Sequence, residues 1–203
     1  MTRIKLCGLS RIDDIEAVNR ILPDYIGFVF AKKSKRYVSK EKAAELKRRL
    51  DERIRAVGVF VNEDYMTVAE YLSEGLIDIA QLHGNEDDDY IDMLRRFSGK
   101  PVIKAFRISG KDDLLTATES TADYILLDAG TGDGIAFDWS ILRDMKRPFF
   151  LAGGLDTENV KDAVEMLSPF AVDVSSGIET EGVKDPEKMK AFTDIVRSVT
   201  HNG

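Results

Sequence analysis

Short runs of apolar and β-branched residues alternate with helical patterns along the chain. A run of this kind, bounded by glycine or polar residues, is typical of a buried strand. The pattern predicts eight strands, at Arg3–Cys7, Tyr25–Phe30, Ala56–Val61, Ile77–His83, Val102–Phe106, Tyr124–Asp128, Phe149–Ala152 and Ala171–Ser175.

Between the strands, the apolar residues of five segments fall on one face of a helix. Ser10 with Asp13 predicts a capping box, and Asp185-Pro186 predicts an N-cap followed by proline at the first helical position. The segments after the fifth and sixth strands have weaker patterns, and we expect the sixth helix to be short. The apolar faces are Ile15, Val18 and Leu22; Ala43, Leu46 and Leu50; Tyr90, Leu94 and Phe97; Val160, Ala163 and Leu167; and Met189, Phe192, Val196 and Val199.

Strands that alternate with helices pair in parallel through right-handed crossovers. Eight such units in 203 residues predict an α/β fold, a single closed (β/α)₈ TIM barrel at the small end of its size range. A doubly wound open sheet is the competing arrangement, but the sequence lacks a Gly-x-Gly-x-x-Gly turn after the first strand. No Gly/Ser-rich linker divides the chain, so we expect one catalytic barrel domain over residues 1–203.

The composition narrows the possible partners. A net charge of −7 opposes attraction to nucleic acid or to anionic lipid, whereas a locally positive pocket can still bind a small anion. The single cysteine excludes an intramolecular disulfide, and we see no signal segment and no membrane-spanning apolar run. We expect a cytoplasmic protein, either a monomer or a homodimer. Only two histidines, His83 and His201, are present, so neither a metal nor another cofactor is expected.

Strand alternation predicts which side chains face the barrel axis. On the first strand, Ile4 and Leu6 should face the helices, which leaves Lys5 and Cys7 inside. Buried charges need partners, and strands one and eight are neighbours in a closed barrel, so we expect Lys5 to lie close to Asp173. The same reasoning predicts four further inward residues, Gln81, His83, Lys104 and Asp173.

Two strand ends carry candidate catalytic groups. Cys7 ends the first strand, although a lone cysteine is usually a small buried hydrophobe. Asp128 ends the sixth strand before a glycine-rich turn, and such an aspartate can equally well only cap the turn. The C-terminal ends of barrel strands are where barrel enzymes place their chemistry, so both residues are candidates.

Anion-binding features follow three other strands. Gly153-Gly154 follows strand seven and Ser175-Ser176 follows strand eight, where barrels commonly hold a phosphate, so we expect a phosphorylated small-molecule ligand. The cationic loop after strand two, usually only a solvated loop, contains Arg36, which could pair with a second anionic group such as a carboxylate. The acidic run at residues 86–89 is predicted to open a helix and has no predicted catalytic role.

Together these segments resemble the phosphoribosylanthranilate isomerases of tryptophan biosynthesis. The resemblance covers nearly the whole chain in the family's order. It rests on Lys5-Leu6-Cys7-Gly8, Gly27-Phe28-Val29-Phe30, Lys33-Ser34-Lys35-Arg36-Tyr37, Val57-Gly58-Val59-Phe60-Val61-Asn62, Gln81-Leu82-His83-Gly84, Leu126-Leu127-Asp128, Phe137-Asp138-Trp139, Gly153-Gly154-Leu155 with Asn159-Val160, and Asp173-Val174-Ser175-Ser176-Gly177.

The resemblance implies an Amadori rearrangement, in which the ribose ring of N-(5-phosphoribosyl)anthranilate opens and the aldose amine becomes a 1-deoxyribulose phosphate. It makes Cys7 the general base at C2 of the sugar, Asp128 the general acid at the ring oxygen and Arg36 the ligand of the anthranilate carboxylate. The base must be a thiolate, and Lys5 is the candidate to lower the thiol pKa. The remaining implied site residues are Gly153, Gly154, Ser175 and Ser176 for the phosphate, with His83 and Asp173 lining the site.

Two alternatives and one departure accompany this interpretation. The analogous isomerase of histidine synthesis resembles a two-aspartate pattern, which Cys7 does not match. A barrel that only binds a phosphorylated ligand would not need both an acid and a base. The segment Gly132-Asp133-Gly134 is shorter than the usual family loop, which bears on how that loop closes over substrate.

Overall fold

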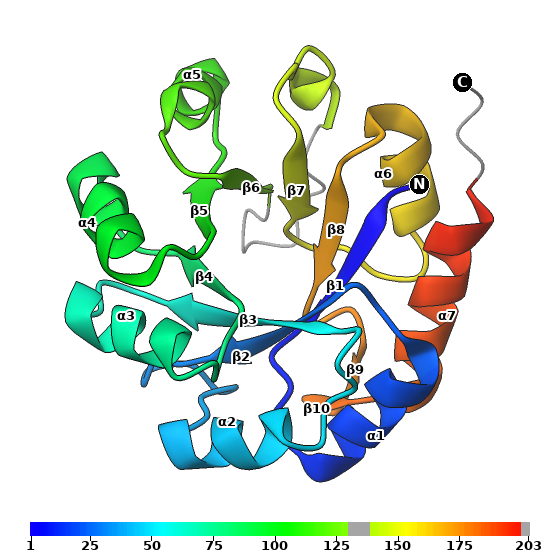
Figure 1. The fold of residues 1–203 in the computed structure, drawn as a ribbon. Helices are drawn as coiled ribbons and strands as arrows, with labels where there is room; N and C mark the ends of the chain where they lie inside the picture. Colours follow the sequence, from blue (N-terminus) through cyan, green and yellow to red (C-terminus); the bar gives the residue numbers. More distant parts are fainter. Residues whose placement is uncertain (130–138, 200–203) are drawn as a thin grey trace.

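The computed structural model describes residues 1–129 and 139–199 of the chain (Figure 1). Expectations for Gly132-Asp133-Gly134, for Phe137-Asp138 and for His201 lie outside these residues. All other predicted elements and site residues fall within them.

Eight parallel strands form a closed barrel in the order of the sequence, and β8 pairs with β1. This confirms the predicted barrel and excludes the open sheet. Figure 1 shows the ring of strands surrounded by helices. The strands are β1 (Arg3–Cys7), β2 (Tyr25–Val29), β3 (Arg55–Phe60), β4 (Ile79–Leu82), β5 (Val102–Arg107), β6 (Tyr124–Asp128), β7 (Phe149–Ala152) and β8 (Ala171–Val174), and a two-stranded hairpin of β9 (Glu179–Thr180) and β10 (Val183–Lys184) follows β8.

Helices follow most of the strands, and two of them, α3 and α5, add to the five that the apolar spacing predicts. After β6, the described residues hold only the short 3₁₀ helix η1 (Trp139–Leu142). Among the described residues, no helix has the length and apolar character needed to cross a bilayer. The helices are α1 (Ile12–Ile21), α2 (Lys40–Lys47), α3 (Tyr65–Ser73), α4 (Asp88–Ser98), α5 (Lys111–Glu119), α6 (Val160–Leu167) and α7 (Pro186–Ser198).

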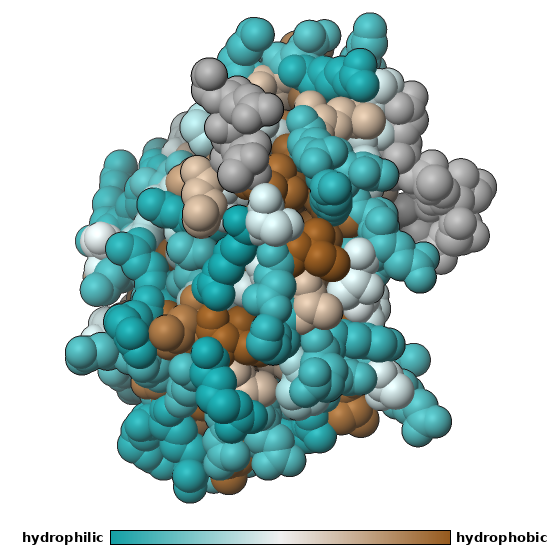
Figure 2. Space-filling model, turned by 90° about the vertical axis from the view of Figure 1, so that its right-hand side faces the viewer, coloured by the Kyte–Doolittle hydropathy of each residue, from teal (hydrophilic) through white to brown (hydrophobic). Residues whose placement is uncertain are grey.

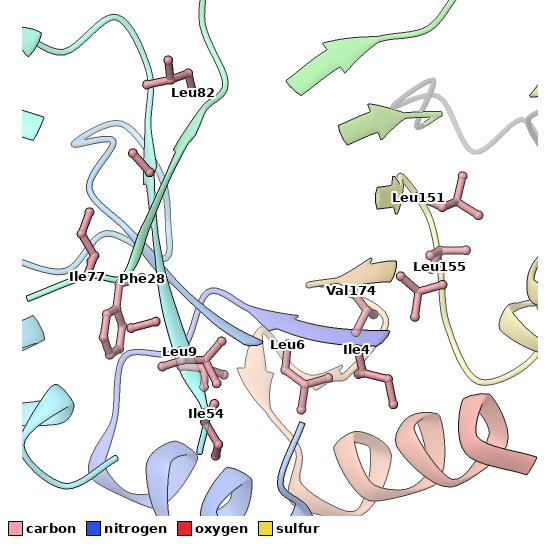
Figure 3. Close-up of a cluster of buried hydrophobic side chains, with 14 of the residues drawn as sticks. Ile4, Leu6, Leu9, Phe28, Ile54, Ile77, Leu82, Leu151, Leu155 and Val174 are labelled. Atoms are coloured by element: carbon pink, nitrogen blue, oxygen red, sulfur yellow. The ribbon is translucent and has the colours of Figure 1, made fainter. Parts of the chain in front are cut away.

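Strand alternation divides most of the buried side chains into two cores, and a small third cluster of Cys7, Val29 and Val59 lies at the mouth of the barrel. Ile4 and Leu6 point from β1 toward the helices and belong to the larger core between barrel and helices (Figure 3). Ile103, Leu126 and Phe150 belong to the second core, which fills the barrel interior. On the side of α6 and α7, hydrophilic residues cover most of the outer surface (Figure 2). The interior is therefore filled below the ends of the strands, which leaves the mouth for polar groups.

The helix caps confirm one predicted start and correct the other. Asp185 accepts hydrogen bonds from the backbone N–H groups of Glu187 and Lys188 at the start of α7, as predicted. At α1, however, Asp14 rather than Asp13 accepts from the backbone N–H groups at positions 10 and 11, at 2.9 and 3.0 Å. The predicted capping box was therefore wrong by one residue.

Lys104 corrects another prediction, because it does not face the barrel axis. Its neighbours of the same parity, Val102 and Phe106, pack in the outer core. The ammonium Nζ of Lys104 instead lies 2.9 Å from a carboxylate oxygen of Glu86 and donates to the carbonyl of Gly84 at 2.7 Å.

Glu86, which was expected only to supply negative charge at a helix start, is the partner in this buried pair. Its carboxylate also accepts from the backbone N–H groups of Asn62 and Gly84, at 2.6 and 2.8 Å. Burial acts to raise the pKa of Glu86, but the hydrogen bonds from Lys104 and from the backbone outweigh it and hold the pKa below its usual value. The pair fastens the loops after β3 and β4 to β5.

We predict that Lys104→Met lowers the free energy of unfolding by about 3 kcal/mol, because it leaves the charge of Glu86 buried without its partner. Lys190→Met is the matched control, because it removes one partner of the exposed pair Lys190–Asp194 and should cost less than about 1 kcal/mol. Urea unfolding at neutral pH measures both. Equal losses in the two variants would contradict the role of the buried pair.

The pair Lys104–Glu86 also makes the free energy of unfolding depend on pH. Because the pKa of Glu86 is lower in the folded state, its stabilising contribution is present above the pKa of an unfolded glutamate, about 4.3, and is lost as the pH falls through the folded value. The difference in stability between wild type and Glu86→Gln should therefore shrink in acid. A difference that grows as the pH falls would contradict the assignment.

Candidate active site

One cavity of about 410 Å³ lies at the C-terminal mouth of the barrel. It brings together every site residue that the sequence predicts, from six strands or the loops that follow them. These residues are Cys7, Arg36, His83, Asp128, Gly153, Gly154, Asp173, Ser175 and Ser176.

The strand register sets the depth of each side chain, because inward residues of alternate strands share a level in such a barrel. His83 and Asp128 occupy the uppermost level with Ser175. Cys7 lies one level deeper, on the neighbouring set of strands, with Asp173 below it. The thiol and the carboxyl group therefore border the same space from different strands and different depths.

Lys5 and Asp173 form the predicted ion pair beneath Cys7. Their charged atoms lie 2.8 Å apart, and the Lys5 side chain is fully buried. Burial acts to lower the pKa of Lys5, but the charges of Asp173 and Cys7 outweigh it and hold the pKa above its ordinary value. Lys5 is therefore a fixed cation at the base of the cavity.

The thiol of Cys7 is protonated more readily than expected. Burial raises the pKa of Cys7, and the nearby Lys5 ammonium opposes this effect without overcoming it. The expectation that Lys5 lowers the thiol pKa is thus wrong in sign for the net shift, although right for the effect of Lys5 alone. Gly27 leaves room for the sulfur, since a Cβ at that position would lie 2.5 Å from Sγ.

Arg36 reaches the cavity by crossing the end of β1. A Cβ on Gly8 would lie 2.4 Å from Cδ of Arg36, so glycine is needed for this path, and its φ of 81° also favours glycine. The guanidinium donates from Nε and Nη2 to the two carboxylate oxygens of Glu179, at 2.6 and 2.8 Å. This fork raises the pKa of Arg36 and fixes its direction.

Glu179 and Lys184 are two residues of this site that the sequence analysis missed. Lys184 lies 2.7 Å from Glu179 and donates to the carbonyl of Ser175 at 2.8 Å, so a buried cation stands beside the serines after β8. Both come from the β9–β10 hairpin. The two-residue turn Glu181-Gly182, with φ of 53° and 79°, is the signal that could have predicted it.

The turns after β7 and β8 have the backbone expected of an anion site. Gly153 and Gly154 adopt φ of 95° and 67°, which side-chain-bearing residues rarely do. The hydroxyl of Ser175 donates to the carbonyl of Cys7 at 3.1 Å and so joins this turn to β1. Together with Ser176, the turns form the polar end of the cavity, and Lys184 lies behind them, bound to the carbonyl of Ser175.

At the opposite rim, His83 meets Asp128. Nε2 of His83 lies 3.4 Å from Oδ2 of Asp128, and both side chains are about one third exposed, at 36% and 29%. A larger hollow of about 1000 Å³ also borders His83 and Asp128 and extends toward the loops after β4 and β5. The carboxyl group therefore faces both solvent and the cavity that contains Cys7.

Comparison with known proteins identifies the family. The sequence model of N-(5'-phosphoribosyl)anthranilate (PRA) isomerase matches residues 4–195. The chain belongs to the PRA isomerase family. Members are isomerases of tryptophan biosynthesis, and so is this chain.

Individual relatives support the family over the full length. The PRA isomerases of Thermoanaerobacter sp. (strain X514) and Caldanaerobacter subterraneus subsp. tengcongensis are 44% and 46% identical, and the alignments cover 98% of this chain and 100% of each relative. The crystal structure of the Thermotoga maritima PRA isomerase matches with a TM-score of 0.91 at 37% identity, covering 98% of this chain and 100% of that chain. A PRA isomerase in complex with reduced 1-(o-carboxyphenylamino)-1-deoxyribulose 5-phosphate matches at 0.88 and 36% over the same shares.

We predict that iodoacetamide modifies Cys7 with a pH inflection above that of an ordinary thiol, about 8.5, because burial disfavours the thiolate. Cys7 is the only cysteine of the chain, so mass spectrometry of the modified protein reports it directly. Cys7→Ser is the control and should not react. An inflection below that of a free thiol would show that Lys5 outweighs burial.

Proposed function

We propose that the cavity at the barrel mouth carries out the Amadori rearrangement of N-(5-phosphoribosyl)anthranilate, with Asp128 as general acid and Cys7 as general base. The observation that carries this proposal is one cavity bordered by the thiol, the carboxyl group, an arginine and the glycine and serine turns after β7 and β8. An isomerisation between aldose and ketose needs one group to give a proton and one to take a proton.

The chemistry balances without a further reactant. Asp128 gives a proton to the ring oxygen of the sugar, the C1–O bond breaks, and the nitrogen lone pair forms a C1=N bond. Cys7, as thiolate, then removes the proton from C2, and the electrons of that C–H bond form a C1=C2 enolamine. As that double bond forms, the second electron pair of the C1=N bond returns to the nitrogen. Tautomerisation of the enolamine then moves the hydroxyl proton at C2 to C1 and gives the ketone. Cys7 is then a thiol and Asp128 a carboxylate. Transfer of one proton from Cys7 to Asp128 restores both groups for the next turnover.

The raised pKa of Cys7 does not prevent this role. A base with a high pKa is present as thiolate in a small fraction, but each thiolate is a stronger proton acceptor. Lys5 lies beside the sulfur and offsets part of the cost of forming the thiolate in a buried position. Lys5 therefore limits how far burial can raise the barrier to C2 deprotonation, although the charge of Asp173 acts in the opposite direction.

Two anion sites orient the substrate between acid and base. We assign the phosphate to Gly153, Gly154, Ser175 and Ser176, near the buried Lys184, and the anthranilate carboxylate to Arg36. Glu179 occupies one edge of the guanidinium, and the second edge, formed by Nη1 and Nη2, is suited to a carboxylate. The similar PRA isomerase with a bound phosphorylated carboxyphenylamino sugar supports a ligand with both groups.

The partner of this site is thus a small phosphorylated molecule, and we propose that the enzyme acts in the cytoplasm.

For the oligomeric state, one similar structure is described as monomers generated from the dimeric PRA isomerase of Thermotoga maritima. We propose that this protein is either a monomer or a homodimer.

We predict that Cys7→Ala and Asp128→Asn each lower kcat at least about 100-fold, since each removes a proton-transfer group while leaving the anion sites intact. The measurement is the fluorescence change on conversion of freshly made phosphoribosylanthranilate, with circular dichroism to establish that the variants fold. Asp194→Asn, on the exposed face of α7, is the control and should keep wild-type turnover. Near-wild-type kcat in either active-site variant would refute the assigned mechanism.

We further predict that Arg36→Met raises KM about 10- to 100-fold with a smaller effect on kcat, because it removes a charged hydrogen-bonding fork from substrate binding. Arg36→Lys keeps the charge without the fork and should fall between wild type and Arg36→Met. A substrate made with aniline in place of anthranilate lacks the carboxylate. With that substrate the three proteins should have similar KM values, and a persisting difference would mean that Arg36 acts elsewhere.

A further inference from the structure

Gln81 is a buried polar residue that the mechanism above leaves without a role. It lies on β4 with 1% of its surface exposed and faces the barrel axis. Its amide Nε2 lies 3.3 Å from Nδ1 of His83, and Nε2 of His83 lies 3.4 Å from Oδ2 of Asp128. Three side chains therefore form a line from the barrel interior to the carboxyl group at the mouth.

The direction of the first contact determines where the ring carries its proton. An amide nitrogen can only donate, so Nδ1 of His83 must accept. A neutral imidazole that accepts at Nδ1 carries its hydrogen on Nε2, which is the nitrogen that faces Asp128. Doubly protonated His83 would have no acceptor for Gln81. The contact from Gln81 therefore selects one tautomer of the ring and aims an N–H group at Asp128.

We propose that Gln81 is a positioning residue that holds His83 as the Nε2–H tautomer, so that the ring donates to the carboxylate that Asp128 becomes when it gives up its proton. The inference rests on the proposed role of Asp128 as general acid. Negative charge develops on Asp128 as the sugar ring opens, and a donor that already points at that oxygen stabilises the charge without reorganisation. In this way Gln81 contributes to ring opening although it is separated from Asp128 by the histidine.

Several charged or titratable groups surround this line, and four of them form two ion pairs. Lys5 of β1 binds Asp173 of β8, and Lys104 of β5 binds Glu86 in the loop after β4. Arg107 on β5 stands opposite Asp128 in the strand register, and Cys7 is the titratable group of β1 that faces the cavity. Asp173 shares the level of Gln81, and each of the two has one buried oxygen, Oδ1 and Oε1, without a hydrogen-bond partner among the described residues.

Because Oε1 of Gln81 has no partner in the described part of the chain, the orientation of the Gln81 amide decides which atom contacts His83. The reversed amide would place Oε1 on Nδ1 of His83, which would require a hydrogen on Nδ1 and leave Nε2 as an acceptor. The two orientations therefore predict opposite tautomers and opposite roles for His83, as donor to Asp128 or as acceptor from it. The tautomer of His83 is the decisive observable.

Nitrogen-15 NMR of the histidine rings in the full-length enzyme measures this tautomer. The chain has only two histidines, and the signal that disappears in His83→Asn identifies His83. We expect wild-type protein near pH 8 to show His83 with its proton on Nε2. Gln81→Met, which has similar length but no amide, should give a mixture of tautomers, and Gln81→Glu should move the proton to Nδ1. A wild-type ring protonated on Nδ1, or a tautomer unaffected by both substitutions, would overturn the proposal.

Kinetics then test whether the tautomer matters for turnover. Gln81→Met should lower kcat about tenfold with KM within about twofold of wild type, the effect of losing one oriented hydrogen bond in the transition state. In a His83→Asn background, adding Gln81→Met should cause little further loss, because Gln81 acts through the ring. An equal loss in both backgrounds would mean that Gln81 acts by another route. The NMR result does not depend on Asp128 being the acid, so failure of this inference and failure of the proposed function can be told apart.

Discussion

The closed barrel forces every second side chain of eight strands into one shared interior, and the chemistry of this protein follows from that constraint. Polar atoms in such an interior cannot turn to water, so each must find a partner or border a cavity. Lys5 and Asp173 satisfy this condition by pairing across the β1–β8 seam. The pair places two charges on the inner face of this seam, beneath the one cysteine of the chain.

The position of Cys7 in the barrel has two opposing effects on the pKa of its thiol. Its depth in the barrel removes water and raises its pKa, while the same depth places it beside a cation whose own charge Asp173 maintains. A thiol nearer to the surface would ionise more easily but would be a weaker base, and a thiol at this depth without Lys5 would have a still higher pKa. A buried ion pair is by itself weak evidence of stabilisation, and its two members act on the thiol in opposite directions: Lys5 lowers the pKa of Cys7 and Asp173 raises it.

The sequence predicted those parts of the structure that depend on period and order. Eight apolar runs gave the barrel, and alternation within β1 and β8 gave the Lys5–Asp173 contact. The prediction for Lys104 was wrong because Lys104 has the same parity as Val102 and Phe106, and both of these residues pack in the outer core. Its true partner, Glu86, lies in a loop, where periodicity carries no information about direction.

Loop contacts account for most of what the sequence could not predict at the site. The cavity lining was predicted because strand ends and glycine turns are visible in the sequence, whereas Glu179 and Lys184 reach the site through a short hairpin whose turn signal is only two residues long. Whether Asp13 or Asp14 caps α1 likewise depends on the path of the chain into the helix. Local patterns thus predict which elements form, and the chain path between them determines which charges meet.

The β9–β10 hairpin fixes the orientation of Arg36 through Glu179. Alone in a cationic loop, Arg36 would be one mobile positive charge among four in the segment Lys32–Arg36. Glu179 fixes one edge of its guanidinium, Lys184 offsets the charge of Glu179, and Gly8 admits the side chain over the end of β1. The guanidinium is therefore already ordered before a ligand binds, and a carboxylate at its second edge does not have to fix it in place. A fixed donor selects ligands by the geometry of the carboxylate as well as by its charge. Because Lys184 also donates to the carbonyl of Ser175, Arg36 and the turn after β8 are held by one continuous network.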